Sequence, residues 1–300
     1  MSSSSPITYP TLPPKLILTS TKAYFPPSRT ISYLGSILDT KNNILPLLTS
    51  HRDQVCFVLI PDFLTIYPCA QTLTASNNLT SPNPSSWPIH LGAQNAFQSS
   101  TYGAYTGEIV PAALKELGCT VVELNHAERR RLLGESDESA AAKAAAVCAL
   151  GMIPLVCIGE LDKPKNTHGP LSQAVGLAMS QLTPQIEAVL RAVPPDAPVI
   201  FAYEPVWAIG AAEPAGVDYV GPVVQAIREV AGRARAGTSK AAEVKVVYGG
   251  SAGPGLWSGK TNGGNGLGKW VDGLFLGRFA HEISGIRAVV EEVVESLDKS

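Results

Sequence analysis

The sequence predicts an α/β protein built as a single (β/α)8 barrel, and three observations support this prediction. Eight short apolar segments alternate with helical segments along the 300 residues, which is typical of a parallel sheet. No change of composition marks a second domain. Polar residues recur where the apolar segments end, as expected around the mouth of a barrel. A doubly wound sheet is the alternative, but no Gly-x-Gly-x-x-Gly motif follows the first strand.

The expected strands are apolar on both faces. Residues 1–14 are rich in Ser and Pro and should form an irregular arm, which leaves 15–300 for the barrel domain. The run Val55–Ile60 is uninterrupted and ends at Pro61, which suits a strand buried on both sides. The strands are expected, in order, at 15–19, 55–60, 89–93, 119–124, 154–158, 199–203, 244–247 and 273–276.

Helices are expected between these strands. The clearest is 136–150, which is rich in Ala, has acidic residues in its first turn and is followed by Gly151. Segments 75–88 and 252–270 are rich in turn-forming residues and should be surface insertions, the second with a short helix. The helices are expected at 28–38, 63–73, 108–117, 136–150, 171–193, 217–233 and 283–297.

Composition excludes several classes of partner. A net charge of −2 and a pI near 6.2 give no electrostatic reason to bind nucleic acid or an anionic membrane. No apolar run approaches the roughly 20 residues that span a bilayer. The N-terminus has neither a basic region nor an apolar core, so no signal peptide is expected. The five cysteines have no metal-ligand spacing and are expected to be reduced thiols of a cytoplasmic protein.

Three strand ends carry reactive side chains: Lys22 follows the first strand, His126 the fourth and Glu204 the sixth. Alone, such a lysine is usually solvated and such a histidine usually satisfies a local hydrogen bond. In a barrel all three open onto one mouth, where they suit proton abstraction beside a carbonyl. The carboxylate would take the proton, and the two nitrogen groups would stabilise the developing oxyanion.

The segment after Glu204 is expected to be an apolar lid. Pro205 biases Glu204 toward an extended backbone, and Val206–Gly210 is apolar where a loop is expected. Glycines follow the seventh and eighth strands, at 249–250 before Ser251 and at Gly277. Barrel enzymes frequently bind phosphate there, although such glycines also serve tight turns.

Several motifs together resemble the triosephosphate isomerase family, whose fold is the TIM barrel. The resemblance covers about 15–297, essentially the whole chain. The motifs are AYEPVWAIG at 202–210, NHAERR at 125–130, GESDE at 134–138, GAQN at 92–95, TGEI at 106–109, CIGE at 157–160 and YGGS at 248–251.

The resemblance implies a role for each reactive side chain. Glu204 would be the base that moves a proton between adjacent carbons, and His126 a neutral electrophile. Lys22 would supply a fixed positive charge to the enediolate and the phosphate. Glu128 would pair with Lys22 or a nearby arginine, and Cys157 would pack behind the base.

The resemblance also implies how the phosphate and the partner are bound. Gly210, Ser251, Gly277 and the backbone of Arg278 would hold the phosphate, beneath a lid at 205–212 that excludes water. No metal or organic cofactor is implied. The loop 94–107 would interdigitate with a second copy, which implies a homodimer with Thr106 reaching the neighbouring site.

The chain departs from the family pattern around the substrate. Ser20 stands where the family has an amide that helps to position the substrate. The lid hinge reads Ala-Ala-Glu-Pro at 211–214, and Pro214 should stiffen it. The Gly-Gly pair after the eighth strand is Gly277-Arg278 here. The Arg278 guanidinium would bind phosphate or an extra hydroxyl, or else point outward toward Glu282.

These departures resemble a divergent branch of the family that includes L-erythrulose-1-phosphate isomerase. Our first hypothesis is interconversion of dihydroxyacetone phosphate and glyceraldehyde 3-phosphate, a step of glycolysis and gluconeogenesis. The second is the same chemistry on a tetrulose phosphate. The third is a catalytically silent paralogue that binds a phosphorylated metabolite or a protein, which would have no use for Glu204 as a base.

Overall fold

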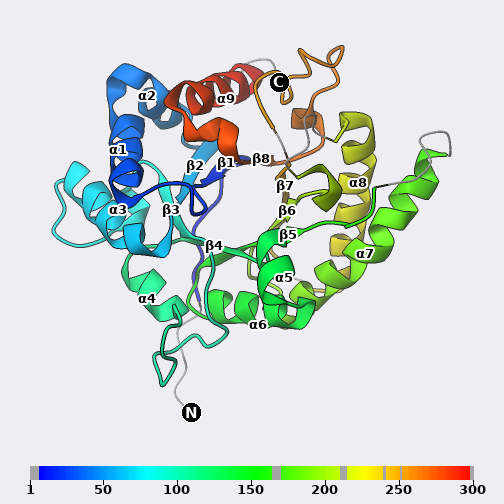
Figure 1. The fold of residues 1–300 in the computed structure, drawn as a ribbon, viewed down its shortest axis with the longest axis horizontal. Helices are drawn as coiled ribbons and strands as arrows, with labels where there is room; N and C mark the ends of the chain where they lie inside the picture. The colour runs from blue at the N-terminus through cyan, green and yellow to red at the C-terminus, as the bar shows by residue number, and fades with distance from the viewer. Residues whose placement is uncertain (1–6, 164–169, 210–214, 239–240, 251, 298–300) are drawn as a thin grey trace.

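The computed structural model describes residues 7–163, 170–209, 215–238, 241–250 and 252–297. Eight parallel strands, each hydrogen-bonded to the next, close into a barrel because β1 also pairs with β8. Figure 1 shows helices placed around these strands. The strands are β1 (Lys15–Ser20), β2 (Val55–Ile60), β3 (His90–Ala93), β4 (Val121–Leu124), β5 (Ile153–Ile158), β6 (Val199–Tyr203), β7 (Val244–Tyr248) and β8 (Gly273–Leu276). The predicted (β/α)8 barrel is confirmed, and closure excludes the doubly wound sheet.

The described helices other than α5 pack apolar residues on the outside of the barrel, whereas no residue of α5 is buried. They are α1 (Pro27–Leu38), α2 (Ile44–Ser50), α3 (Phe63–Ser76), α4 (Pro111–Glu116), α5 (Ala127–Leu133), α6 (Asp137–Cys148), α7 (Leu171–Ala192), α8 (Val217–Ala234) and α9 (Ile283–Leu297). Short 3-10 helices follow β6 (Val206–Ala208) and β8 (Arg278–His281), at the same end of the barrel.

The core has two layers, because successive strand side chains point to opposite faces. One layer lies between the strands and the helices. The other fills the barrel interior with Leu16, Leu18, Val58, Ile60, Val121, Ile153, Leu155, Cys157, Ile200, Ala202, Val247 and Phe275. Because these side chains fill the barrel interior, a ligand can bind only at an end of the barrel.

The structure corrects the predicted helices in four places. Helix α2 was not expected, and α5 was expected only as part of a motif; each has seven residues, too few for a clear helical period. Helix α4 begins at Pro111 rather than at residue 108, because Gly107 has a φ of 88° and proline favours the first helical position. In the 252–270 insertion the short helix is a 3-10 turn, Leu267–Lys269.

Two further expectations concern the chain as a whole. Among the described residues, no helix is long and apolar enough to cross a membrane. All five cysteines lie in the described part of the chain and are free thiols; they are Cys56, Cys69, Cys119, Cys148 and Cys157.

Candidate active site

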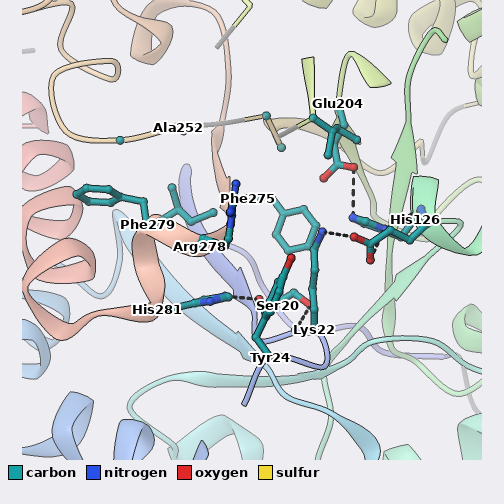
Figure 2. A pocket seen from close by; sticks show the side chains of 17 residues that line it. Ser20, Lys22, Tyr24, His126, Glu204, Ala252, Phe275, Arg278, Phe279 and His281 are labelled. Atoms are coloured by element: carbon teal, nitrogen blue, oxygen red, sulfur yellow. Dashed lines mark hydrogen bonds and ion pairs between the residues drawn. The ribbon is translucent and has the colours of Figure 1, made fainter. Parts of the chain in front are cut away.

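A cavity of about 710 Å³ opens where the strands end, and Figure 2 shows the side chains around it. The three reactive residues predicted from the sequence all line it: Lys22 after β1, His126 after β4 and Glu204 after β6. These residues are far apart in the chain and meet only because the carboxyl ends of parallel strands share one face of the barrel. The cavity is therefore the candidate active site.

Glu204 is a buried carboxylate without a hydrogen-bond partner for its Oε2 among the described residues. Its backbone is fixed, because the Glu204 N–H donates to the Ile158 carbonyl at 2.9 Å, which extends the β5–β6 ladder. Only 4% of the residue is exposed. Burial raises its pKa to about 8; the Lys22 charge opposes this, and the Glu123 and Glu128 charges add to it. Such a carboxylate is poised to accept a proton near neutral pH.

Gly249 provides the space in which this carboxylate lies. A Cβ at Gly249 would approach the Glu204 Cγ to 2.4 Å and its Oε1 to 2.6 Å, closer than carbon atoms pack. The sequence suggested that Gly249 and Gly250 bind an anion. The structure gives Gly249 an additional task, since it makes room for the base.

His126 faces Glu204 across the cavity as a neutral imidazole. It lies at the N-terminus of α5, where the Glu128 N–H donates to His126 Nδ1 at 3.1 Å. Because Nδ1 accepts, the ring proton is on Nε2. Nε2 lies 3.6 Å from Glu204 Oε2 (Figure 2). Burial and the Lys22 charge lower the His126 pKa to about 4, although Glu128 opposes them. The imidazole can therefore donate Nε2–H to an oxygen in the cavity.

Lys22 is held in the cavity by Glu128. Its Nζ donates to Glu128 Oε1 at 2.9 Å, which matches one of the two pairings expected for Glu128. Burial lowers the Lys22 pKa, but the hydrogen bond and charge of Glu128 outweigh it and leave the pKa above its usual value. The backbone is in the left-handed region with φ 47°, and Gln94 Nε2 donates to the Lys22 carbonyl at 3.0 Å. The ammonium is thus a fixed cation.

The candidate phosphate residues are only partly described. Ser20 and Gly277 line the cavity, while Gly210, Ser251 and the hinge at 211–214 lie outside the described residues. The Ser20 hydroxyl accepts from the Lys22 N–H at 3.4 Å, and its carbonyl is 3.1 Å from His281 Nε2. The phosphate-binding role of these residues remains a prediction.

Arg278 also lines the cavity, on the same side as Phe279 and His281 in Figure 2. Its side chain has no hydrogen bond or ion pair within the described part of the chain. Glu282, the outward partner considered for it, instead binds Arg29 at 2.8 Å. The guanidinium is therefore available to a ligand.

Cys157 lies where the resemblance suggested, in the barrel interior below the cavity. Burial raises the pKa of its thiol well above the usual value, and the Glu204 charge adds to the effect. The described part of the lid is anchored through Trp207, whose Nε1 donates to Glu160 Oε1 at 2.8 Å. Ile209, two residues after Trp207 in the segment predicted to be a lid, lines the cavity.

Sequence reasoning missed several residues that line the cavities at this mouth. Tyr24, Phe279 and His281 line the main cavity, but nothing in their spacing marked them. Glu123 lines a second cavity of about 260 Å³ beside the first. The sequence could have indicated Glu123, because it is the one carboxylate in the apolar strand β4.

Comparisons with known proteins agree with this geometry. The family model described as triosephosphate isomerase matches residues 15–293. An L-erythrulose-1-phosphate isomerase from Pectobacterium atrosepticum is 38% identical over 275 residues, covering 91% of this chain and 93% of the relative. One from Rhizobium etli is 37% identical over 81% of each chain. A triosephosphate isomerase from Chloroflexus aurantiacus is 40% identical, covering 56% of this chain and 64% of the relative.

Proposed function

The chain belongs to the triosephosphate isomerase family and is an isomerase, and within that family we propose that it acts on a phosphorylated four-carbon ketose. The reaction moves a proton between the carbonyl carbon and its hydroxyl-bearing neighbour. The observation that carries the isomerase chemistry is the buried Glu204 carboxylate, whose Oε2 has no hydrogen-bond partner among the described residues and lies 3.6 Å from Nε2 of the neutral His126.

The mechanism uses Glu204 as a carboxylate, His126 as a neutral imidazole and Lys22 as an ammonium. Glu204 removes the proton from the carbon beside the carbonyl, which leaves an enediolate. His126 donates its Nε2–H to the oxygen that gains charge, and Lys22 stabilises the same negative charge. Glu204 then returns the proton to the adjacent carbon, and the hydroxyl proton passes from the oxygen that becomes the new carbonyl, through His126, to the oxygen that becomes the new hydroxyl. No net charge or atom is gained in the cycle.

Two observations favour a four-carbon substrate over a triose phosphate. The two relatives described above that match over 81% or more of both chains are named L-erythrulose-1-phosphate isomerases. Arg278 lines the cavity with no partner among the described residues, so its guanidinium is free to bind a further hydroxyl or the phosphate. The triose phosphate predicted first from the sequence is the second candidate, supported by the shared motif around Glu204. A silent paralogue is disfavoured, because a binding protein gains nothing from a buried unpaired carboxylate.

A panel assay tests the substrate. Purified protein should turn over erythrulose phosphates with a higher kcat/KM than dihydroxyacetone phosphate. The reverse order would favour the triose substrate, and the absence of turnover on every sugar phosphate would favour the silent paralogue.

Arg278→Gly tests the proposed specificity. A charge-assisted hydrogen bond contributes about 1.5–3 kcal/mol, so the ratio of kcat/KM for four-carbon over three-carbon substrates should fall about tenfold or more. Arg29→Ala is the matched control, because Arg29 is a nearby arginine that binds Glu282 and does not line the cavity. An unchanged ratio in Arg278→Gly would exclude the guanidinium from substrate recognition.

We also infer a homodimer, in which the second cavity receives the loop 94–107 of another copy. Leu132 and Leu133 line this cavity, yet they are 69% and 63% exposed, so they are available to a partner. Tyr102, in the loop itself, is 58% exposed. Sedimentation of wild type and Leu132→Asp tests this: the variant should be monomeric, and a monomeric wild type would refute the dimer. The free thiols support a cytoplasmic location, which we propose as well.

A further inference from the structure

We propose that Glu123 is a positioning residue that takes up a proton when an anionic ligand enters the mouth. Its carboxyl shares the second cavity with Ser20 and Lys22, and its neutral form removes one negative charge from the surroundings of the Lys22 ammonium. The proposal rests on the proposed function only in that the ligand is an anion.

Glu123 is a carboxyl in the barrel interior. It lies in β4 two residues after Val121, which belongs to the interior cluster, so the two side chains share the inward face. Only 3% of the residue is exposed, yet it lines the second cavity together with Ser20 and Lys22. A carboxyl at this place is costly to bury and needs a reason.

The contacts of Glu123 are incomplete. Its carboxyl lies near the Ser20 side chain, whose hydroxyl favours the ionised form. Within the described part of the chain, its Oε2 has no hydrogen-bond partner. Ser20 and Lys22 line both cavities, so Glu123 reaches the main site through them. A buried carboxyl with one unused oxygen can hold a proton there without breaking an existing bond.

Charged and titratable groups on several elements lie around Glu123. They are Lys22 after β1, Glu128 and Arg129 in α5, Glu204 after β6 and the Cys157 thiol of β5. Burial raises the Glu123 pKa to about 7, while the Ser20 hydroxyl and the Lys22 charge lower it. An arriving dianion adds negative charge nearby and favours the protonated form further. The proton comes from bulk water.

This proton uptake reduces the negative charge around the base. The Glu123 carboxylate raises the Glu204 pKa through like charge, so a neutral Glu123 makes Glu204 easier to ionise. Lys22 then has one fewer carboxylate competing for its charge.

Sulfate binding gives a test that does not depend on isomerase activity. Sulfate is a dianion that does not titrate between pH 6 and pH 8, and a Glu204→Gln background removes the base. In that background the dissociation constant for sulfate should be about three- to tenfold higher at pH 8 than at pH 6, measured by calorimetry. Adding Glu123→Gln should bring this ratio close to one. At pH 7, calorimetry in two buffers should show proton uptake only when Glu123 is present.

The pKa values of other groups in the site are shifted away from this range. Burial holds the His126 pKa at about 4 and lowers that of His281, while Lys22 and Glu128 are shifted away from neutrality. Asp272→Asn in the same background is the control. Asp272 is a carboxylate just before β8, at the opposite end of the barrel, and it binds Arg228 at 2.8 Å. It should leave the sulfate ratio of the Glu204→Gln protein unchanged.

The outcomes separate this proposal from the proposed function. An equal pH dependence with and without Glu123 would overturn the role of Glu123 alone. Failure to bind sulfate at either pH, in a variant that unfolds cooperatively, would overturn the anion site and this proposal with it. If Glu123→Gln does not fold, Glu123→Leu gives the same comparison, because the neighbouring strand residues are apolar.

A pH profile distinguishes a positioning residue from a structural one. In Glu123→Gln with Glu204 intact, the acid limb of kcat/KM should move to lower pH, because a negative charge that raises the Glu204 pKa is gone. A merely structural residue would lower kcat/KM equally at every pH. That second result would overturn the proposal.

Discussion

Two buried glutamates follow neighbouring strands and have opposite surroundings. Glu160, two residues after β5, is 1% exposed, and its Oε1 accepts from Tyr203 at 3.2 Å, Trp207 at 2.8 Å and Tyr219 at 2.8 Å. Glu204, after β6, is 4% exposed, and no described residue donates a hydrogen bond to its side chain, while the Oε2 of both glutamates is unpartnered. Burial raises the pKa of both.

The difference shows that burial alone does not make a catalytic base. Three donors hold Glu160 in place, so its carboxylate anchors the lid through Trp207. No such donors offset the burial of the charged Glu204 carboxylate, so protonation of Glu204 is favoured. The same residue type is thus structural at one strand end and reactive at the next.

The largest expected effect is that of Glu204→Gln on turnover. A general base contributes 10²- to 10⁴-fold, so kcat should fall about 10³-fold while KM changes little. The fold should be at least as stable as wild type, because an unsupported buried charge is removed. Steady-state kinetics and thermal unfolding measure both. Turnover near that of wild type would mean that Glu204 is not the base.

The next effect should appear in stability when Glu160 is changed to Leu. Three donors lose their acceptor, and each unsatisfied buried donor costs about 1–3 kcal/mol. Some of this is recovered because a buried charge is also lost, so we expect the free energy of unfolding to fall by about 2–3 kcal/mol. Urea denaturation measures it. A variant as stable as wild type would show that these hydrogen bonds do not anchor the lid.

The pH dependence of stability should separate wild type from Glu204→Gln. The folded pKa of Glu204 is about 8, above the ordinary 4.5, so the folded state binds more protons between these values. Stability must then fall as pH rises from about 4.5 to 8, by at most about 1.4 kcal/mol per pH unit for one group. Glu204→Gln should lack this part of the slope. Identical slopes in urea titrations would show that Glu204 keeps its ordinary pKa.

The smallest effect should be that of Glu160→Gln. Its amide oxygen can still accept from Tyr203, Trp207 and Tyr219, so stability should change by less than about 1 kcal/mol and kcat by only a few-fold. By contrast, the same change from glutamate to glutamine at position 204 is expected to remove most of the activity. A loss of turnover comparable to that of Glu204→Gln would break the comparison and give Glu160 a direct part in the reaction.

The sequence predicted the barrel well, because strand periodicity and alternation with helices are local signals. It also indicated Lys22, His126 and Glu204, because polar residues at strand ends stand out against apolar runs. It did not reveal Tyr24 or His281, which reach the cavity only through the closure of β1 on β8. Such residues depend on contacts between distant parts of the chain.

Short elements and protonation states were also beyond local patterns. Helix α5 is too short to show a helical period in the sequence, yet its first turn donates the N–H that fixes the His126 tautomer. The raised pKa of Glu204 depends on how completely the folded chain excludes water. That exclusion of water involves several segments of the chain at once.

Gly249 carries one more consequence. Because the base occupies the volume that a side chain at position 249 would fill, the residues at 204 and 249 constrain each other. Even a methyl group at 249 would remove the space for the Glu204 carboxylate, and no change at 204 that keeps the glutamate would restore that space. Directed evolution that randomises both positions together should return glycine whenever it returns an active glutamate.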